Sequence, residues 1–141
     1  MEYVCDAPPH TWFRFLTEAE AAQEAKEMGH AVDKFFRDMR ARAVKAYVPP
    51  KAVPYIEQSI GREDHIKSSM PLFLTLRDDT GAPQVTAMLP AGGRDDKTFR
   101  PIVVGRANAD PYPAFAAAIR RLGEHYGISL PADRCYPYRR T

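Results

Sequence analysis

Histidine and cysteine are the residue types in this chain best suited to holding a metal ion. By number alone they are sufficient for a zinc site: His10, His30, His65, His125, Cys5 and Cys135. Neither Cys5 with His10 nor His125 with Cys135 shows the spacing of two to four residues that is usual between paired zinc ligands. The sequence therefore predicts no metal site, and no other cofactor is expected.

A second group of residues is typical of acid–base chemistry. The string Asp79-Thr80-Gly81-Ala82 resembles the catalytic motif of retroviral-type aspartic proteases, and the string from Ile102 to Arg106 resembles their second signature. The resemblance implies a small hydrolase in which two aspartates share a proton. However, Arg77 and Asp78 stand where that family has apolar residues, and Asp-Thr-Gly also favours a turn. A hydrolase is therefore the least favoured function, and a non-catalytic role is favoured over an enzyme.

The C-terminal end combines arginine with tyrosine. The candidate binding residues are Arg120, Arg121, Tyr136, Tyr138, Arg139 and Arg140. Interleaved arginine and tyrosine suit protein contacts as well as nucleic-acid backbones with stacked bases. We expect a non-catalytic binding or adaptor protein that acts through protein–protein contacts. The alternative is a nucleic-acid-binding accessory protein that uses the same Arg/Tyr patch.

Length and composition are typical of one globular domain spanning residues 1–141. Hydrophobic residues make up 45% and charged residues 27% of the 141 residues, with a net charge of +2. A net charge this small argues weakly against a dedicated nucleic-acid binder. No apolar run approaches the roughly 18 residues of a membrane span, and the first residues do not resemble a secretion signal. We expect a cytoplasmic protein with no membrane partner.

The N-terminal third predicts a strand followed by a long helix. Residues 10–16 are rich in aromatic side chains, which favours a strand. Thr17 and Glu20 then form a capping box, so a helix is expected to begin at Thr17. The apolar residues of this helix recur every three or four positions and form one stripe: Ala21, Ala25, Met28, Val32, Phe35, Met39 and Ala43. One helix of about 28 residues is predicted, with Gly29 at a bend or close contact, and with a surface suited to a homodimer.

The remaining elements complete an α+β pattern. Residues 55–60 can form one helical turn, and residues 61–70 are expected to be a loop. Residues 72–77 and 84–89 predict a hairpin, residues 99–104 a third strand, and residues 110–126 a helix that begins at Asp110 and Pro111. Residues 128–141 are expected to be an irregular C-terminal tail. The predicted order is β-α-β-β-β-α, an antiparallel sheet with the long N-terminal helix and the C-terminal helix packed on one face.

Overall fold

The computed structural model contains a five-stranded antiparallel sheet, which confirms the α+β class. The structure describes residues 1–48 and 55–135, with side chains throughout these ranges except 55–60. The strands are β1 (Glu2–Ala7), β2 (His10–Arg14), β3 (Leu72–Arg77), β4 (Pro83–Leu89) and β5 (Ile102–Val104). The helices are α1 (Glu18–Met28), α2 (Val32–Ala46), α3 (Tyr55–Ser69) and α4 (Tyr112–Tyr126). Two short 3₁₀ turns, η1 (Ala91–Gly93) and η2 (Arg106–Asn108), flank β5.

The strands pair in chain order, from β1 at one edge to β5 at the other. The predicted hairpin is present, with Leu72 opposite Leu89 and Thr75 opposite Thr86. Helices α1, α2 and α3 are inserted between β2 and β3, which nevertheless pair directly through Trp12 and Leu76. Strand β1 was not predicted from the sequence, because Glu2–Ala7 mixes charged and apolar residues without regular alternation.

The predicted long helix is wrong: the structure divides it into α1 and α2. The capping box of Thr17 and Glu20 begins α1 as expected. Gly29 then adopts the left-handed conformation (φ 69°) and ends the helix, because glycine reaches this conformation without steric cost. The homodimer surface was assigned to one long helix, and it stays a prediction.

The break also changes which residues of α2 are buried. Phe36 is buried, whereas Phe35 is 46% exposed. The new stripe therefore runs through Val32, Phe36, Met39 and Ala43, at steps of four, three and four. The assignment of Phe35 to the core was wrong, because that assignment assumed one continuous helical phase from Thr17 onward.

Helix α3 replaces the loop predicted for residues 61–70. Its described part is polar, and only Ile66 among its residues with described side chains is buried. Because so few apolar positions contact the core, the sequence carries almost no periodic signal for this helix.

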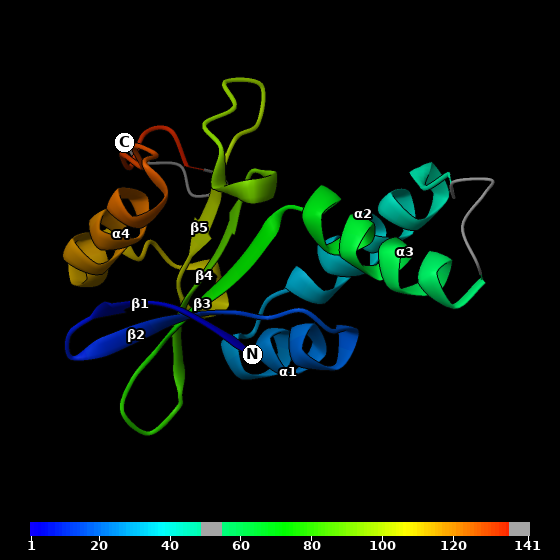
Figure 1. Ribbon diagram of the computed structural model, residues 1–141. Helices are drawn as coiled ribbons and strands as arrows, with labels where there is room; N and C mark the ends of the chain where they lie inside the picture. The colour runs from blue at the N-terminus through cyan, green and yellow to red at the C-terminus, as the bar shows by residue number, and fades with distance from the viewer. Residues whose placement is uncertain (49–54, 136–141) are drawn as a thin grey trace.

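The helices occupy both faces of the sheet, which corrects the prediction of a single covered face. Leu72, Leu74 and Leu76 pack with α4 on one side. Phe73, between them on β3, packs on the other side with Phe15 and Phe36. Figure 1 shows α4 on one side of the strands and α1, α2 and α3 on the other. Phe73, Thr75 and Arg77 alternate with these leucines, so the second face of β3 is partly apolar and partly polar, and both faces carry apolar side chains that need cover.

Strand β5 is shorter than predicted and lies at the edge of the sheet. It begins at Ile102 rather than at residue 99, and Pro101 precedes it directly. Proline has no N–H to donate to the ladder, which limits the strand at this end. Among the described helices, none is long and apolar enough to cross a membrane.

Candidate functional site

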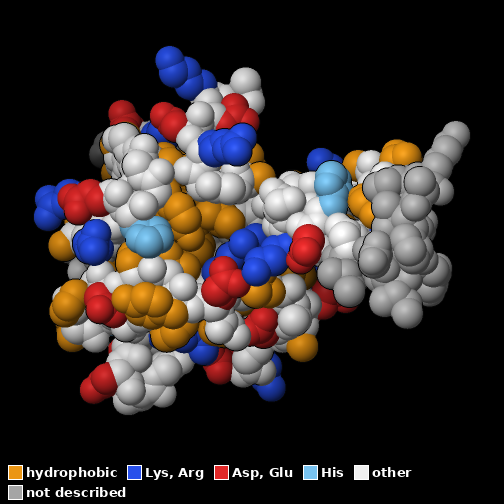
Figure 2. Space-filling model, in the orientation of Figure 1, with side chains coloured by type: hydrophobic (Ala, Val, Ile, Leu, Met, Phe, Trp, Pro, Cys, Tyr) orange, Lys and Arg blue, Asp and Glu red, His pale blue; other side chains and the backbone are white. Residues whose placement is uncertain are grey.

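The structure places only part of the predicted Arg/Tyr patch. Arg120 and Arg121 are exposed on α4, and Arg120 Nε lies 4.0 Å from Glu124 Oε1 within the same helix. Tyr136, Tyr138, Arg139 and Arg140 lie outside the described residues. The patch therefore stays a prediction, with Arg120 and Arg121 available to solvent on one helix. Figure 2 shows basic and acidic side chains interspersed over the described surface that it displays.

The Asp-Thr-Gly string forms the turn between β3 and β4. The structuring carboxylate is that of Asp78, whose Oδ1 accepts hydrogen bonds from the backbone N–H groups of Thr80 (2.9 Å) and Ala82 (3.0 Å). These bonds, together with one from the Thr80 hydroxyl, hold the pKa of Asp78 below its ordinary value. Asp79 itself is exposed at the tip of the turn. This geometry supports a turn-forming role for the string.

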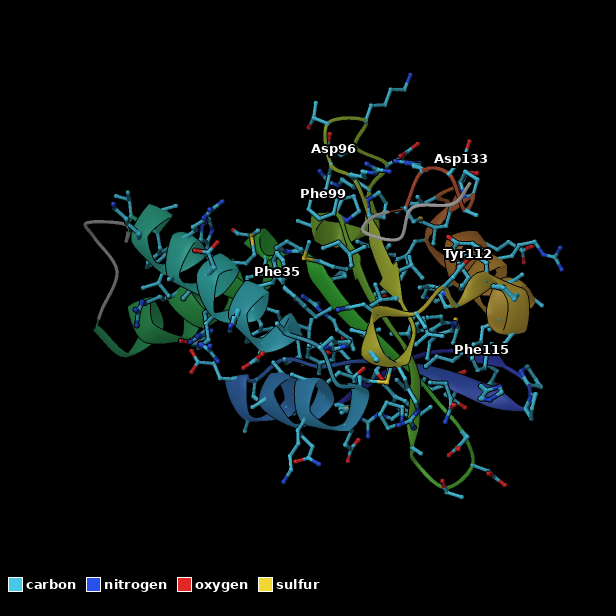
Figure 3. All side chains as sticks on the ribbon, turned by 180° about the vertical axis from the view of Figure 1, so that it is seen from behind. Phe35, Asp96, Phe99, Tyr112, Phe115 and Asp133 are labelled. Atoms are coloured by element: carbon cyan, nitrogen blue, oxygen red, sulfur yellow. The ribbon has the colours of Figure 1, made fainter. Side chains whose placement is uncertain are left out.

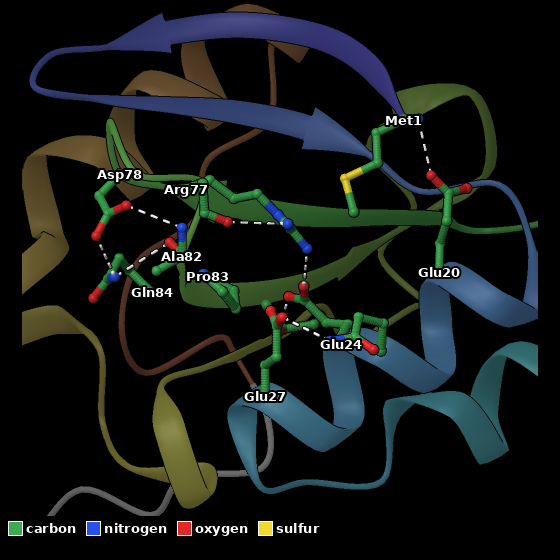
Figure 4. Close-up of polar contacts among 12 residues, drawn as sticks. Met1, Glu20, Glu24, Glu27, Arg77, Asp78, Ala82, Pro83 and Gln84 are labelled. Carbon is green, nitrogen blue, oxygen red and sulfur yellow. Dashed lines mark hydrogen bonds and ion pairs between the residues drawn. The ribbon is translucent and has the colours of Figure 1, made fainter.

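A chain of buried polar side chains connects α1 to the sheet. Glu24 of α1 is fully buried (0% exposed). Its Oε1 accepts a hydrogen bond from Arg77 Nη2 at 3.0 Å, drawn in Figure 4. Its Oε2 accepts a second bond from the Thr86 hydroxyl at 2.6 Å. His30 Nε2 lies 2.8 Å from the same hydroxyl. Arg77, Glu24, Thr86 and His30 therefore form one continuous network, called here the Glu24 network.

Hydrogen bonding fixes the direction of the Glu24 network. The backbone N–H of Val32 points at His30 Nδ1 at 3.4 Å, so Nδ1 accepts and Nε2 carries the proton. Nε2–H then donates to Thr86 Oγ1, whose own proton goes to Glu24. Both ring nitrogens of His30 are engaged within the protein.

Burial shifts the pKa values at the two ends of this network in opposite directions. Desolvation raises the pKa of Glu24, although hydrogen bonds from Thr86 and Arg77 partly offset the effect. The nearby Thr75 hydroxyl also lowers the pKa of Glu24. This hydroxyl makes no hydrogen bond of ordinary geometry with any described group. Desolvation lowers the pKa of His30. The network therefore favours a neutral imidazole, because a second ring proton would meet the Val32 N–H.

A pocket of about 190 Å³ opens beside His30 and Thr86. Its apolar wall comes from α2, β4 and β5, and consists of Val32, Phe35, Ala87, Met88, Ile102 and Val104. Asn108 adds a third polar side chain at the wall. Figure 3 shows Phe35 on the side of α2 that faces the strands. We call this cavity and its exposed aromatic residue the Phe35 pocket.

The loop at one end of the Phe35 pocket has an unusual backbone. Ala107 (φ 54°) and Asn108 (φ 60°) both occupy the left-handed region, which costs non-glycine residues free energy. Arg106 holds the loop in place: its Nη2 donates to the Pro83 carbonyl at 2.7 Å and its Nη1 to the Glu27 carbonyl at 3.1 Å. A strained loop that is fixed from two elements is typical of a site whose shape matters.

The sequence contains one signal for this site. Glu24 lies three residues after Ala21 and four before Met28, on the buried stripe of α1, where a charged residue requires a partner. The partner could not be identified, because Arg77 and Thr86 come from strands that are more than fifty residues away. The Phe35 pocket was also hidden, because it depends on the break at Gly29.

Within residues 1–48 and 55–135, no group of three or more histidine, cysteine, aspartate or glutamate side chains is arranged to hold a metal ion. Comparison with protein-family models, curated proteins and solved structures finds no match to this chain. The fold and site define an α+β protein with a meander sheet, a buried polar network and an apolar surface pocket.

Proposed function

We propose that this protein is a non-catalytic binding protein whose partner is another protein, and that the partner inserts an apolar side chain into the Phe35 pocket. The observation that supports this proposal is the 46% exposure of Phe35 beside an apolar cavity of about 190 Å³. An exposed aromatic residue next to a preformed pocket is typical of the central contacts of a protein interface.

The surroundings of the pocket suit a protein partner. The polar side chains of His30, Thr86 and Asn108 line the pocket beside its apolar residues. His30 and Thr86 are held by the Glu24 network and keep one wall rigid. Binding to a preorganised pocket loses less conformational entropy than binding to a mobile one.

The Glu24 network supports a positioning role rather than catalysis. A carboxylate that is 0% exposed does not reach a substrate, and each nitrogen of His30 already has a hydrogen-bond partner inside the protein. The network instead fixes the end of α1, the start of α2 and the centre of β4 relative to one another. Of these segments, the start of α2 and the centre of β4 line the pocket.

Affinity capture from the native host tests the proposal. The full chain is immobilised as the parent, as Phe35→Asp and as Tyr3→Asp, with nuclease present throughout. Tyr3 is the matched control, because it is a 59% exposed aromatic residue on β1, at the opposite edge of the sheet. We expect a protein that is retained by the parent and by Tyr3→Asp, and lost with Phe35→Asp. Retention of the same protein by all three would contradict the proposal.

Nucleic-acid binding through the Arg/Tyr patch is the second candidate function, because Arg120 and Arg121 are exposed side by side on α4. Affinity for mixed-sequence RNA or DNA that falls about tenfold or more over a severalfold rise in salt would favour it. Arg120→Gln/Arg121→Gln should then weaken binding, whereas Phe35→Asp should leave it unchanged. Binding that is insensitive to both salt and the double substitution would exclude this candidate.

A further inference from the structure

We infer that the partner segment docks as an extended strand along β5, so that its backbone continues the sheet while one of its side chains enters the Phe35 pocket. This inference rests on the proposed function and specifies the form of the partner. Strand β5 is an edge strand that pairs with β4 on one side only. In the part of the chain that the structure describes, no backbone hydrogen bond joins Ile102, Val103 or Val104 to any segment other than β4.

The two edges of the sheet differ in how they are protected against pairing. Strand β1 contains the charged residues Glu2 and Asp6 and has an irregularity in its pairing between Tyr3 and Cys5. Charged residues and bulges at a sheet edge are two means by which proteins prevent another strand from adding. Strand β5 is Ile-Val-Val, with no charge and with regular pairing to β4. Of the two edges, β5 is the one that lacks both a charge and a bulge, although it is short and follows Pro101.

The pocket lies on the correct face for a strand added at β5. Ile102 and Val104 line the Phe35 pocket, whereas Val103 points to the opposite face and packs in the core beneath α4. An added strand alternates its side chains in the same way, so every second side chain lies on the pocket side. One of these side chains would lie next to Ile102 or Val104, within reach of Phe35.

The ends of β5 set the length and chemistry of the segment. Pro101 closes one end, and at the other end Gly105 turns back to donate to the Ala109 carbonyl at 2.8 Å. Three to five residues therefore have room to pair, at about 3.4 Å per residue. The segment should be uncharged at its centre, apolar at alternate positions and free of proline where it must donate N–H groups.

A phage-displayed library of random twelve-residue peptides, panned against the full chain, supplies the probe. A selected peptide is synthesised with a fluorophore, and its affinity is measured by anisotropy for the parent, Phe35→Asp and Tyr3→Asp. The peptide is then N-methylated at one position at a time, which removes single backbone donors. We expect loss of about tenfold at alternate positions and little change at the positions between them. Phe35→Asp should abolish binding, and Tyr3→Asp should not.

The outcomes separate this inference from the proposed function. A peptide that is lost with Phe35→Asp but tolerates every single N-methylation would show that only its side chains bind, so the strand model would be wrong and the pocket would stand. An alternating N-methyl pattern with full binding to Phe35→Asp would place strand addition away from the pocket and contradict both statements. A library that yields no binder would also overturn the strand model.

Discussion

The two faces of the sheet are built by different means. Beneath α4, apolar side chains from every strand pack with Ile119 and Leu122. The Trp12 indole N–H on this side donates to the Ala118 carbonyl at 2.9 Å. The opposite face also has a core, around Phe36 and Phe73, but next to this core it buries the charged Glu24 and leaves the Phe35 pocket open. We call these the closed face and the open face.

The open face contains features that reduce the stability of the fold. A buried ion pair contributes little net stability, since the desolvation of both charges offsets their attraction. The open face also contains the left-handed backbone of Ala107 and Asn108, which costs free energy. These features lie on the same face as the pocket, whereas the described residues of the closed face include neither. We therefore infer that the closed face holds the fold together and that the open face shapes a binding surface.

Trp12→Ala should give the largest effect, because it leaves a large cavity in the closed face and removes the indole hydrogen bond to the Ala118 carbonyl. We expect a loss of about 3–5 kcal/mol in the free energy of unfolding, measured by urea denaturation. Trp12→Phe, which keeps most of the apolar volume, should lose less. A loss below about 1 kcal/mol for Trp12→Ala would contradict the role given to the closed face.

Glu24→Ala should destabilise the open face by about 3 kcal/mol, because it leaves the Arg77 guanidinium partly buried without its partner. The pair replacement Glu24→Leu with Arg77→Met should recover most of that loss, since it removes both charges together. If the double variant were as unstable as the single one, the network would be a main source of stability rather than a device for positioning.

The pH dependence of stability should differ in sign between the two ends of the Glu24 network. The pKa of His30 is below its ordinary value of 6.5, so its contribution is full above pH 6.5 and is lost as pH falls through the folded pKa. The pKa of Glu24 is above its ordinary value of 4.5, so its contribution is full below pH 4.5 and is lost as pH rises through the folded pKa.

Matched variants isolate these two contributions. Relative to His30→Gln, the parent should gain stability as pH rises from about 5 to about 7. Relative to Glu24→Gln, the parent should lose stability as pH rises above 4.5. Urea denaturation at several pH values measures both differences. Slopes of the same sign would show that one of the two groups is not desolvated as the structure indicates.

Phe35→Ala should give the smallest effect on stability, within about 0.5 kcal/mol, because nearly half of the Phe35 side chain is already exposed to solvent. Phe36→Ala, at the neighbouring position, is the buried control and should lose about 3–5 kcal/mol. The same pair of thermal or urea measurements tests the helix break at Gly29. Equal losses for both variants would mean that both side chains are buried.

The sequence predicted best the elements with a local signal. The hairpin of β3 and β4, the capping box at Thr17 and the end of α4 at Gly127 each depend on residues close together in the chain. The break between α1 and α2 was only suggested by Gly29, because the apolar stripe continues in sequence across it. The sequence did not predict helix α3, because most of its side chains that the structure describes face solvent.

The candidate site could not be predicted from residues that are close together in the sequence. Glu24, Arg77 and Thr86 meet only when α1 packs on strands that follow it after two further helices, and no spacing rule connects them. The Arg/Tyr patch, by contrast, was chosen because its residues are clustered in sequence. A cluster in the sequence shows only that similar residues are neighbours along the chain, whereas the residues of the open face are brought together by tertiary packing.

Methionine-methyl NMR tests the central claim most directly. Met88 lines the Phe35 pocket, whereas Met28 and Met70 are buried elsewhere and Met1 is exposed near the other edge of the sheet. With ¹³C-methyl-methionine-labelled full chain, saturating addition of the selected peptide should shift the Met88 signal and leave those of Met28, Met70 and Met1 in place. An unchanged Met88 signal, with a shift at Met1, would contradict binding at the open face.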